Sequence, residues 1–182
     1  MNERIKRLTK PLSILAVLVF VICYIIDKPQ ALADYTSYIG YSISAVSILF
    51  VAYDRFLWKH IPWNRPPTLK KKYNGVLRYK YGGVSDEKNI SIVVKQSWLT
   101  ISIQAETDIN SSVSVAASIV TEYGCDVLYY SYVTSPSAAS QETNPIQHGT
   151  CRMKLGGDNS RIYGTYWTSS KTIGDIEWTA EE

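Results

Sequence analysis

The chain has 182 residues, a formal net charge of +3, three cysteines and two histidines. Three widely separated cysteines exclude a disulfide-rich scaffold and a cysteine-based zinc site. The basic excess lies within residues 1–72, whereas the part from Tyr73 onward has eight basic and twelve acidic residues. This distribution excludes a surface built for a long nucleic acid, because such a surface carries a local excess of positive charge.

Two apolar runs near the N-terminus, Leu12–Ile26 and Tyr35–Tyr53, contain no charged side chain. The hydrocarbon core of a bilayer is about 30 Å thick, and a helix crosses it with roughly 17–25 apolar residues. Lipid offers the backbone no hydrogen-bond partner, so such a run spans a membrane as a helix. We therefore predict a two-helix transmembrane hairpin over residues 1–57, with spans at about 11–27 and 34–56.

Basic residues flank the predicted hairpin on both outer sides, whereas the connector Asp27–Asp34 has Lys28 against two aspartates. By the positive-inside rule both flanks lie in the cytoplasm and the connector lies outside. Both termini, and the domain that follows the hairpin, are then cytoplasmic. A secretory signal is the alternative, because Ala31-Leu32-Ala33 resembles a cleavage site that ends at Ala33.

Residues 58–72 are predicted to form a basic linker between the membrane and a folded domain. Pro62, Pro66 and Pro67 stiffen this linker and prevent a helix from continuing through it. Lys70–Lys72 are placed to contact anionic lipid head groups, or else they form a simple flank of the membrane span.

From Tyr73 onward apolar residues recur at every second position, which is typical of β-strands. No stretch of helical period intervenes, and this excludes a fold of alternating strands and helices. Eight strands are predicted, each bounded by Gly, Asn, Asp, Ser or Pro: Tyr73–Tyr81, Ile90–Lys95, Trp98–Ala105, Val113–Thr121, Asp126–Val133, Thr150–Leu155, Arg161–Thr168 and Thr172–Trp178.

Eight short strands with short links predict an all-β domain, residues 73–182, folded as a lipocalin-like up-and-down antiparallel barrel. A closed barrel leaves no sheet edge open to aggregation, and a sandwich is the alternative. In the fourth strand Val113, Val115, Ala117 and Ile119 are expected to face inward. The polar link Ser135–Gln147 is expected to lie at one mouth of the barrel.

Motifs of catalysis are absent from the sequence, which has no H-E-x-x-H, G-x-S-x-G, P-loop or G-x-G-x-x-G pattern. A nucleophile pair of Cys151 and His148 is conceivable, but nothing beside it resembles an orienting third group. The domain is therefore predicted to be a binding module rather than an enzyme, with no cofactor and no metal.

Tyrosines concentrate on two predicted strands, at Tyr129, Tyr130 and Tyr132 and at Tyr163 and Tyr166. An eight-stranded barrel is wide enough for one small ligand, and aromatic rings with a few cations suit stacked bases and phosphates. The alternative is that the rings fill the core and the charges face solvent. The basic candidates for such a site are Arg78, Lys95, Arg152, Lys154, Arg161 and Lys171.

Four small residues, Ser37, Gly40, Ser44 and Ser47, fall on one face of the second predicted span. Small residues let helices approach closely in lipid. This face is expected either to pack within the hairpin or to mediate oligomerisation between chains.

Four short motifs occupy the C-terminal half: Tyr-Ser-Tyr-Val-Thr-Ser-Pro at 130–136, His-Gly-Thr at 148–150, Ile-Tyr-Gly-Thr-Tyr-Trp-Thr at 162–168 and Lys-Thr-Ile-Gly-Asp-Ile at 171–176. With the two membrane spans and the barrel, they resemble the two-transmembrane β-barrel effectors of CBASS antiphage defence. The resemblance covers nearly the whole chain, although each motif is short.

This resemblance implies a receptor for a cyclic dinucleotide made by a partner nucleotidyltransferase after phage infection. In that family the barrel holds the ligand, the protein self-associates, and the bacterial inner membrane is disrupted, which kills the infected cell. Carried over by motif, the ligand is expected to lie among Tyr130, Tyr132, Tyr166, Thr168 and Thr172.

The chain departs from the family pattern in the turn after the third motif, where an arginine is common and Ser169-Ser170 and Lys171 stand here. Lys171 or Arg78 is therefore expected to contact the phosphates, and Arg152 is a further candidate. A membrane-tethered, lipocalin-like carrier of a small apolar ligand is the alternative function.

Overall fold

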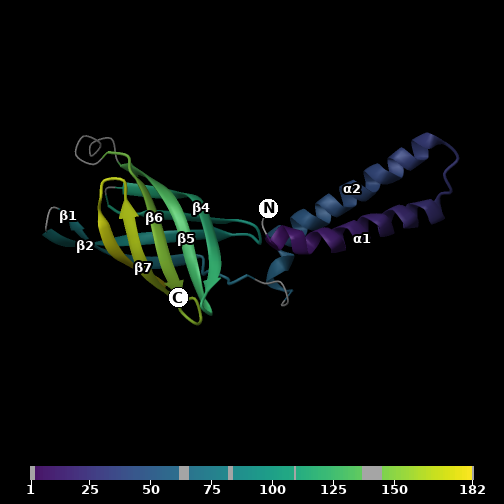
Figure 1. Ribbon diagram of the computed structural model, residues 1–182. Coiled ribbons are helices and arrows are strands. Elements are labelled where there is room, and N and C mark those ends of the chain that lie inside the picture. The colour runs from purple at the N-terminus through teal and green to yellow at the C-terminus, as the bar shows by residue number, and fades with distance from the viewer. Residues whose placement is uncertain (1–2, 62–65, 82–83, 109, 137–144, 182) are drawn as a thin grey trace. The chain divides into compact units, whose positions relative to one another are not determined.

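The computed structural model describes the chain except for residues 1–2, 62–65, 82–83, 109, 137–144 and 182. The chain forms two compact units, Met1–Trp63 and Asn64–Glu182 (Figure 1). The first unit is helical, and the second consists of β-strands.

Two long helices make up the first unit: α1 spans Glu3–Ile26 and α2 spans Leu32–Arg55, and the short 3-10 helix η1 follows at Leu57–Lys59. Each long helix has 24 residues. At 1.5 Å per residue this gives a length of about 36 Å, more than the roughly 30 Å of a bilayer core. Both helices are thus long and apolar enough to cross a membrane.

The hairpin packs through one side of α2, where Tyr38 and Ser42 are buried. The Tyr38 ring meets Phe20 of α1 edge-on, with centroids 6.3 Å apart, and its hydroxyl donates to the carbonyl of Asp27 in the connector. Large apolar side chains on the outer faces, such as Val17, remain exposed. An apolar outer surface of this kind suits lipid better than water.

Within the described residues, eight strands form the second unit, and each pairs antiparallel with the next along the chain. β1 also pairs with β8, so the sheet is closed. The predicted up-and-down barrel is therefore confirmed, and the sandwich is excluded. The strands are β1 Lys72–Tyr81, β2 Val84–Gln96, β3 Ile101–Glu106, β4 Asn110–Glu122, β5 Cys125–Pro136, β6 His148–Leu155, β7 Arg161–Thr168 and β8 Ile173–Ala180.

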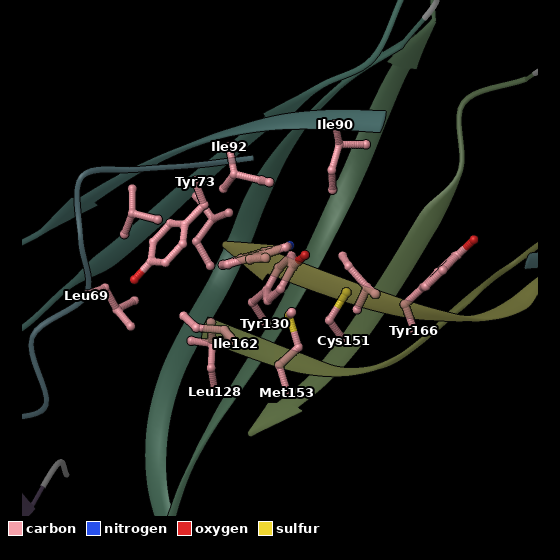
Figure 2. Packing of buried hydrophobic residues seen from close by; sticks show 14 of the residues in the cluster. Leu69, Tyr73, Ile90, Ile92, Leu128, Tyr130, Cys151, Met153, Ile162 and Tyr166 are labelled. Atoms are coloured by element: carbon pink, nitrogen blue, oxygen red, sulfur yellow. The ribbon is translucent and has the colours of Figure 1, made fainter. Parts of the chain in front are cut away.

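The core runs along the barrel interior as one cluster of side chains (Figure 2). Tyr73 and Trp178 pack together, with ring centroids 5.6 Å apart, and Tyr166 lies at the opposite end of the cluster from Tyr73. Leu128 and Met153 lie between these ends and are fully buried. Burial of one such side chain stabilises the fold by about 1.5–3 kcal/mol.

Strand β4 corrects one expectation from the sequence. Val113 and Val115 were expected to face inward, but they are 48% and 73% exposed. The pairing with β5 shifts register between Ser114 and Ala116, because β4 holds one extra residue there. A shift of one residue exchanges the two faces of a strand. The prediction was therefore wrong for Val113 and Val115.

The inward positions before the bulge hold serines instead. Ser112 donates to the carbonyl of Ala105 at 3.3 Å, and the Ser114 hydroxyl accepts from the N–H of Ile103 at 2.9 Å. After the bulge Ala117 packs against the core, as expected from the sequence. The bulge therefore brings polar side chains into one end of an otherwise apolar interior.

The chain enters the barrel through a segment that is bound to it. The Gln96 side chain donates to the carbonyl of Pro67 and accepts from the N–H of Leu69, each at 2.9 Å. Asn159 donates to the carbonyl of Thr68 at 3.1 Å. Leu69 itself is buried in the core. Part of the predicted linker is therefore anchored to the barrel, and its residues 62–65 lie outside the described residues.

The long link between β5 and β6 is closed at its base by two hydrogen bonds. The N–H of Thr134 donates to the carbonyl of Gln147, and the N–H of Gln147 donates to the Thr134 hydroxyl, each at 2.9 Å. Residues 137–144, the greater part of this expected mouth loop, lie outside the described residues.

Candidate functional site

A cavity of about 100 Å³ lies inside the barrel, at the end that carries the β3–β4 and β7–β8 turns. This end is called the mouth below. Tyr130 and Tyr132 of β5, Cys151 of β6 and Tyr166 of β7 line the cavity. The structure thus brings three tyrosines of the predicted site together, although Tyr166 comes from another motif than Tyr130 and Tyr132. In Figure 2, Tyr130 and Cys151 lie between Tyr73 at one end and Tyr166 at the other.

Two glycines make room for the cavity tyrosines. Gly149 pairs with Tyr132 across β5 and β6, and a Cβ atom at Gly149 would lie 2.7 Å from Tyr132 Cε1. Gly174 pairs with Tyr166 across β7 and β8, and a Cβ there would lie 2.8 Å from Tyr166 Cε1. Each ring therefore lies across the glycine of the neighbouring strand. The His-Gly-Thr motif and the last motif supply these two glycines.

The cavity wall carries no charged side chain among the described residues. Burial raises the pKa of the Cys151 thiol to about 12, although its hydrogen bond with Tyr130 acts in the opposite direction. Burial also raises the pKa of Tyr130, Tyr132 and Tyr166. The wall thus offers ring faces, hydroxyls and a thiol that stay protonated at neutral pH. Such a wall suits a ligand group that is a planar ring with hydrogen-bonding edges. It suits a charged ligand group less well.

Three polar residues at the mouth were missed by the sequence reasoning. Tyr79, Asp86 and Lys88 lie on inward positions of β1 and β2, because Tyr79 pairs with Asp86 and the inward Leu77 pairs with Lys88. The Tyr79 hydroxyl donates to Asp86 Oδ2 at 2.7 Å. The alternation of β2 continues from Ile90 back through Lys88 and Asp86, and that pattern was the available signal.

The two predicted arginines lie on the outer face of the barrel. Arg78 forms ion pairs with Glu87 at 3.1 Å and with Glu177 at 3.7 Å. Arg152 pairs with Glu122 at 2.5 Å and donates to the Tyr129 hydroxyl at 2.8 Å.

The Glu122 carboxylate accepts hydrogen bonds from both Tyr129 and Arg152. The hydrogen bond from Tyr129, and then that from Arg152, holds the pKa of the Glu122 carboxyl below its ordinary value. This arrangement is a closed cluster on the outer surface, and it does not reach the cavity.

The other predicted ligand residues lie in or beside the β7–β8 turn. Thr168 pairs with the inward Gly149, and its hydroxyl accepts from the N–H of Thr172 at 3.3 Å. Lys171 is exposed and has a φ of 63°, in the left-handed region that a tight turn requires. This turn borders the mouth, and the structure leaves the roles of these three residues as predictions.

The conceivable nucleophile pair is not assembled. Cys151 faces the cavity, whereas His148 pairs with Val133 and is exposed on the other face of β6. Residues three apart on a strand point to opposite faces. No cluster of His, Cys, Asp or Glu suitable for a metal ion occurs among the described residues.

The four small residues of α2 face away from α1. Ser37, Gly40, Ser44 and Ser47 are all exposed, whereas the hairpin contact uses Tyr38 and Ser42. A Cβ atom at Gly40 would meet nothing within 4 Å. Packing within the hairpin therefore does not account for these small residues.

A wider groove of about 980 Å³ lies at the end of the barrel opposite the mouth, beside Pro66–Lys70 and the β6–β7 turn. It has no aromatic residue in its lining and is open to solvent. It therefore offers nothing on which a planar ring could stack.

Comparisons with known proteins found matches to a family model and to a relative of this chain. Residues 65–180 match the model of the family described as "Cap15, cyclic dinucleotide receptor domain". The chain is also 32% identical to the CD-NTase-associated protein 15 of Staphylococcus schleiferi over 182 residues, which covers 97% of each protein. The match extends over the helical hairpin as well as the barrel.

Proposed function

Because this chain belongs to the Cap15 family of CBASS effectors, we propose that its barrel binds a cyclic dinucleotide and that binding activates its membrane helices. The observation that carries the proposal is the cavity lined by Tyr130, Tyr132 and Tyr166. Stacking on an aromatic ring contributes about 1–3 kcal/mol to the binding free energy of any base. The same motifs that identify the family supply these rings and the glycines beneath them.

The size of the cavity restricts how the ligand can lie. Pockets that enclose a drug-sized ligand have volumes of about 300–1,000 Å³, and this cavity has about 100 Å³. A cyclic dinucleotide is therefore proposed to insert one base among the tyrosines while its sugar–phosphate ring stays at the mouth. The phosphates then remain near water and near the polar residues of the mouth.

The membrane step is proposed from the hairpin. The helices α1 and α2 are proposed to cross the bacterial inner membrane with both termini in the cytoplasm, as the flanking basic residues favour. Ligand binding is proposed to favour self-association, which brings the exposed Ser37–Ser47 face of one chain against another. Close packing of several hairpins would then disrupt the bilayer and kill the infected cell. The ligand would come from a partner nucleotidyltransferase.

The test is calorimetric titration of the full chain in detergent. The probes are cyclic dinucleotides of two purines, two pyrimidines and one of each, with a linear dinucleotide as the control ligand. We expect saturable binding of at least one cyclic form. Replacement Tyr166→Leu should weaken it about tenfold or more, because a stacking ring is lost.

The matched control is Tyr163→Leu, since Tyr163 lies on the same strand but is exposed on the outer face. Tyr163→Leu should leave the affinity unchanged. Absence of binding to every cyclic dinucleotide, together with binding of a fatty acid, would instead establish the carrier function.

A further inference from the structure

Two charged side chains of β2, Asp86 and Lys88, point toward the barrel interior at the mouth. Residues directly opposite each other in an antiparallel pair share a face of the sheet. Lys88 is opposite Leu77, which lines the cavity, and it stands two residues from Ile90, which also lines it. At roughly 3.3 Å per residue, Lys88 begins about 7 Å beyond Ile90 toward the mouth.

Lys88 is held in place by a small polar cluster. Its Nζ atom lies 5.6 Å from the centroid of the Tyr79 ring, and the Tyr79 hydroxyl donates to Asp86 Oδ2 at 2.7 Å. The other carboxylate oxygen of Asp86 accepts from the N–H of Glu87 at 2.8 Å. Both oxygens of Asp86 are thus bound by the protein. Lys88 is half-buried, and its ammonium group lies over the face of the Tyr79 ring. Among the described residues, no carboxylate forms an ion pair with it.

The other cations whose side chains the structure describes in the strands face outward. Among the lysines and arginines whose side chains the structure describes in β1–β8, Lys88 is the one at an inward position. Arg78, Arg152 and Arg161 are on the outer face in ion pairs with glutamates.

We propose that Lys88 is the phosphate contact of the receptor site, positioned over the Tyr79 ring by the Tyr79–Asp86 hydrogen bond. The proposal rests on the proposed function and deepens it, because it names the cation for the phosphodiester groups. A base inserted among the tyrosines leaves the sugar–phosphate ring at the height of Lys88. There the ammonium group of Lys88 lies near a ligand that carries two negative charges. In surroundings less polar than water, the attraction between these charges is stronger than in water.

The experiment compares Lys88→Met with Lys95→Met in the full chain in detergent. Lys95 is on the same strand but faces outward, and both replacements remove one positive charge and keep an unbranched side chain. The probe is the cyclic dinucleotide that binds the unaltered chain. We expect Lys88→Met to weaken binding about 10- to 100-fold, and Lys95→Met to change it less than twofold.

Two further measurements separate phosphate contact from a merely structural role. The affinity of the unaltered chain should fall as salt is raised from 50 to about 500 mM, and that of Lys88→Met should fall less steeply. Lys88→Arg should recover most of the affinity, because it restores the charge. If Lys88→Met lowers the melting temperature, Lys88→Gln serves as the second variant.

The outcomes are distinguishable. If the unaltered chain binds and both Lys88→Met and Lys88→Gln bind equally well, the Lys88 proposal is overturned while the receptor function stands. If the unaltered chain binds no cyclic dinucleotide, both proposals are overturned. Weaker binding with the same salt dependence as the unaltered chain would also overturn the phosphate contact.

Discussion

At the scale of single residues, the candidate site depends on two glycines, which have no side chain. Gly149 and Gly174 each lie beneath a tyrosine ring of the adjacent strand. A β-strand glycine leaves room for a ring to lie flat across the sheet, and the ring covers the exposed backbone in return. The orientation of Tyr132 and Tyr166 toward the cavity is therefore set by their neighbours.

The two glycines should respond differently to alanine. A Cβ at Gly149 conflicts with the far end of the Tyr132 ring, which can move. A Cβ at Gly174 conflicts also with the carbonyl of Arg78 and the Cα of Tyr79, which are backbone atoms. We expect Gly174→Ala to destabilise the barrel by about 1–3 kcal/mol, and Gly149→Ala to destabilise it less while weakening ligand binding.

Urea unfolding and calorimetric titration measure these two effects. Gly157→Ala is the control, because a Cβ there meets nothing within 4 Å. Equal loss of stability in Gly149→Ala and Gly174→Ala, or unaltered affinity in Gly149→Ala, would contradict the proposed role of the Tyr132 ring.

At the scale of elements, two local features define the ends of the barrel. The bulge in β4 turns Ser112 inward beside the cavity, so the mouth is polar where the rest of the interior is apolar. At the opposite end, Gln96 and Asn159 bind the entering segment, and Leu69 fills the core. The barrel is thus completed by residues that precede its first strand.

This anchoring predicts how removal of the entering segment changes the stability of the barrel. A chain of residues 73–182 loses the buried Leu69 and both hydrogen bonds of Gln96, whereas a chain of residues 64–182 keeps them. Burial of a leucine and one or two hydrogen bonds together contribute about 2–5 kcal/mol.

We expect the shorter chain to unfold at lower urea concentration by that difference in free energy. Leu69→Ala in the longer chain, which keeps the backbone hydrogen bonds, should fall between the two. Equal stability of the two chains would mean that the entering segment contributes nothing to the barrel.

At the scale of the whole molecule, the features behind the proposed ligand binding and the proposed membrane action belong to separate units. The barrel holds the cavity, and the helical unit holds the exposed small-residue face of α2. A change on that face should therefore impair assembly without altering the ligand site.

We expect the double replacement of Gly40 and Ser44 by leucine to abolish ligand-dependent release of a dye from vesicles. The reason is that two large side chains hold neighbouring helices apart. The dissociation constant of the ligand should stay the same. Ser13→Leu, at an exposed position of α1, is the matched control and should leave dye release intact. Undiminished release by the double variant would exclude this face from assembly.

The sequence by itself determined the helical spans, the strands and the family. Apolar runs without charge and an alternating period are local properties, and they appear in the chain before it folds. The closed order of strands followed from short links between them, since neighbours in sequence then pair in space. The resemblance of short motifs to a family also predicted Tyr130, Tyr132 and Tyr166 as ligand residues, and these three fall on inward positions of β5 and β7.

Only the tertiary structure decided which side chains meet at the mouth. The bulge between Ser114 and Ala116 reverses the faces of β4, and one extra residue leaves no clear mark in the sequence. The inward placement of Lys88 and the outward placement of Arg78 follow from the register of β1 against β2. Register depends on contacts between strands, and a shift of β2 by one residue would turn Lys88 to the outer face, which Arg78 already occupies. The chemistry of the candidate site is for this reason a property of the closed barrel.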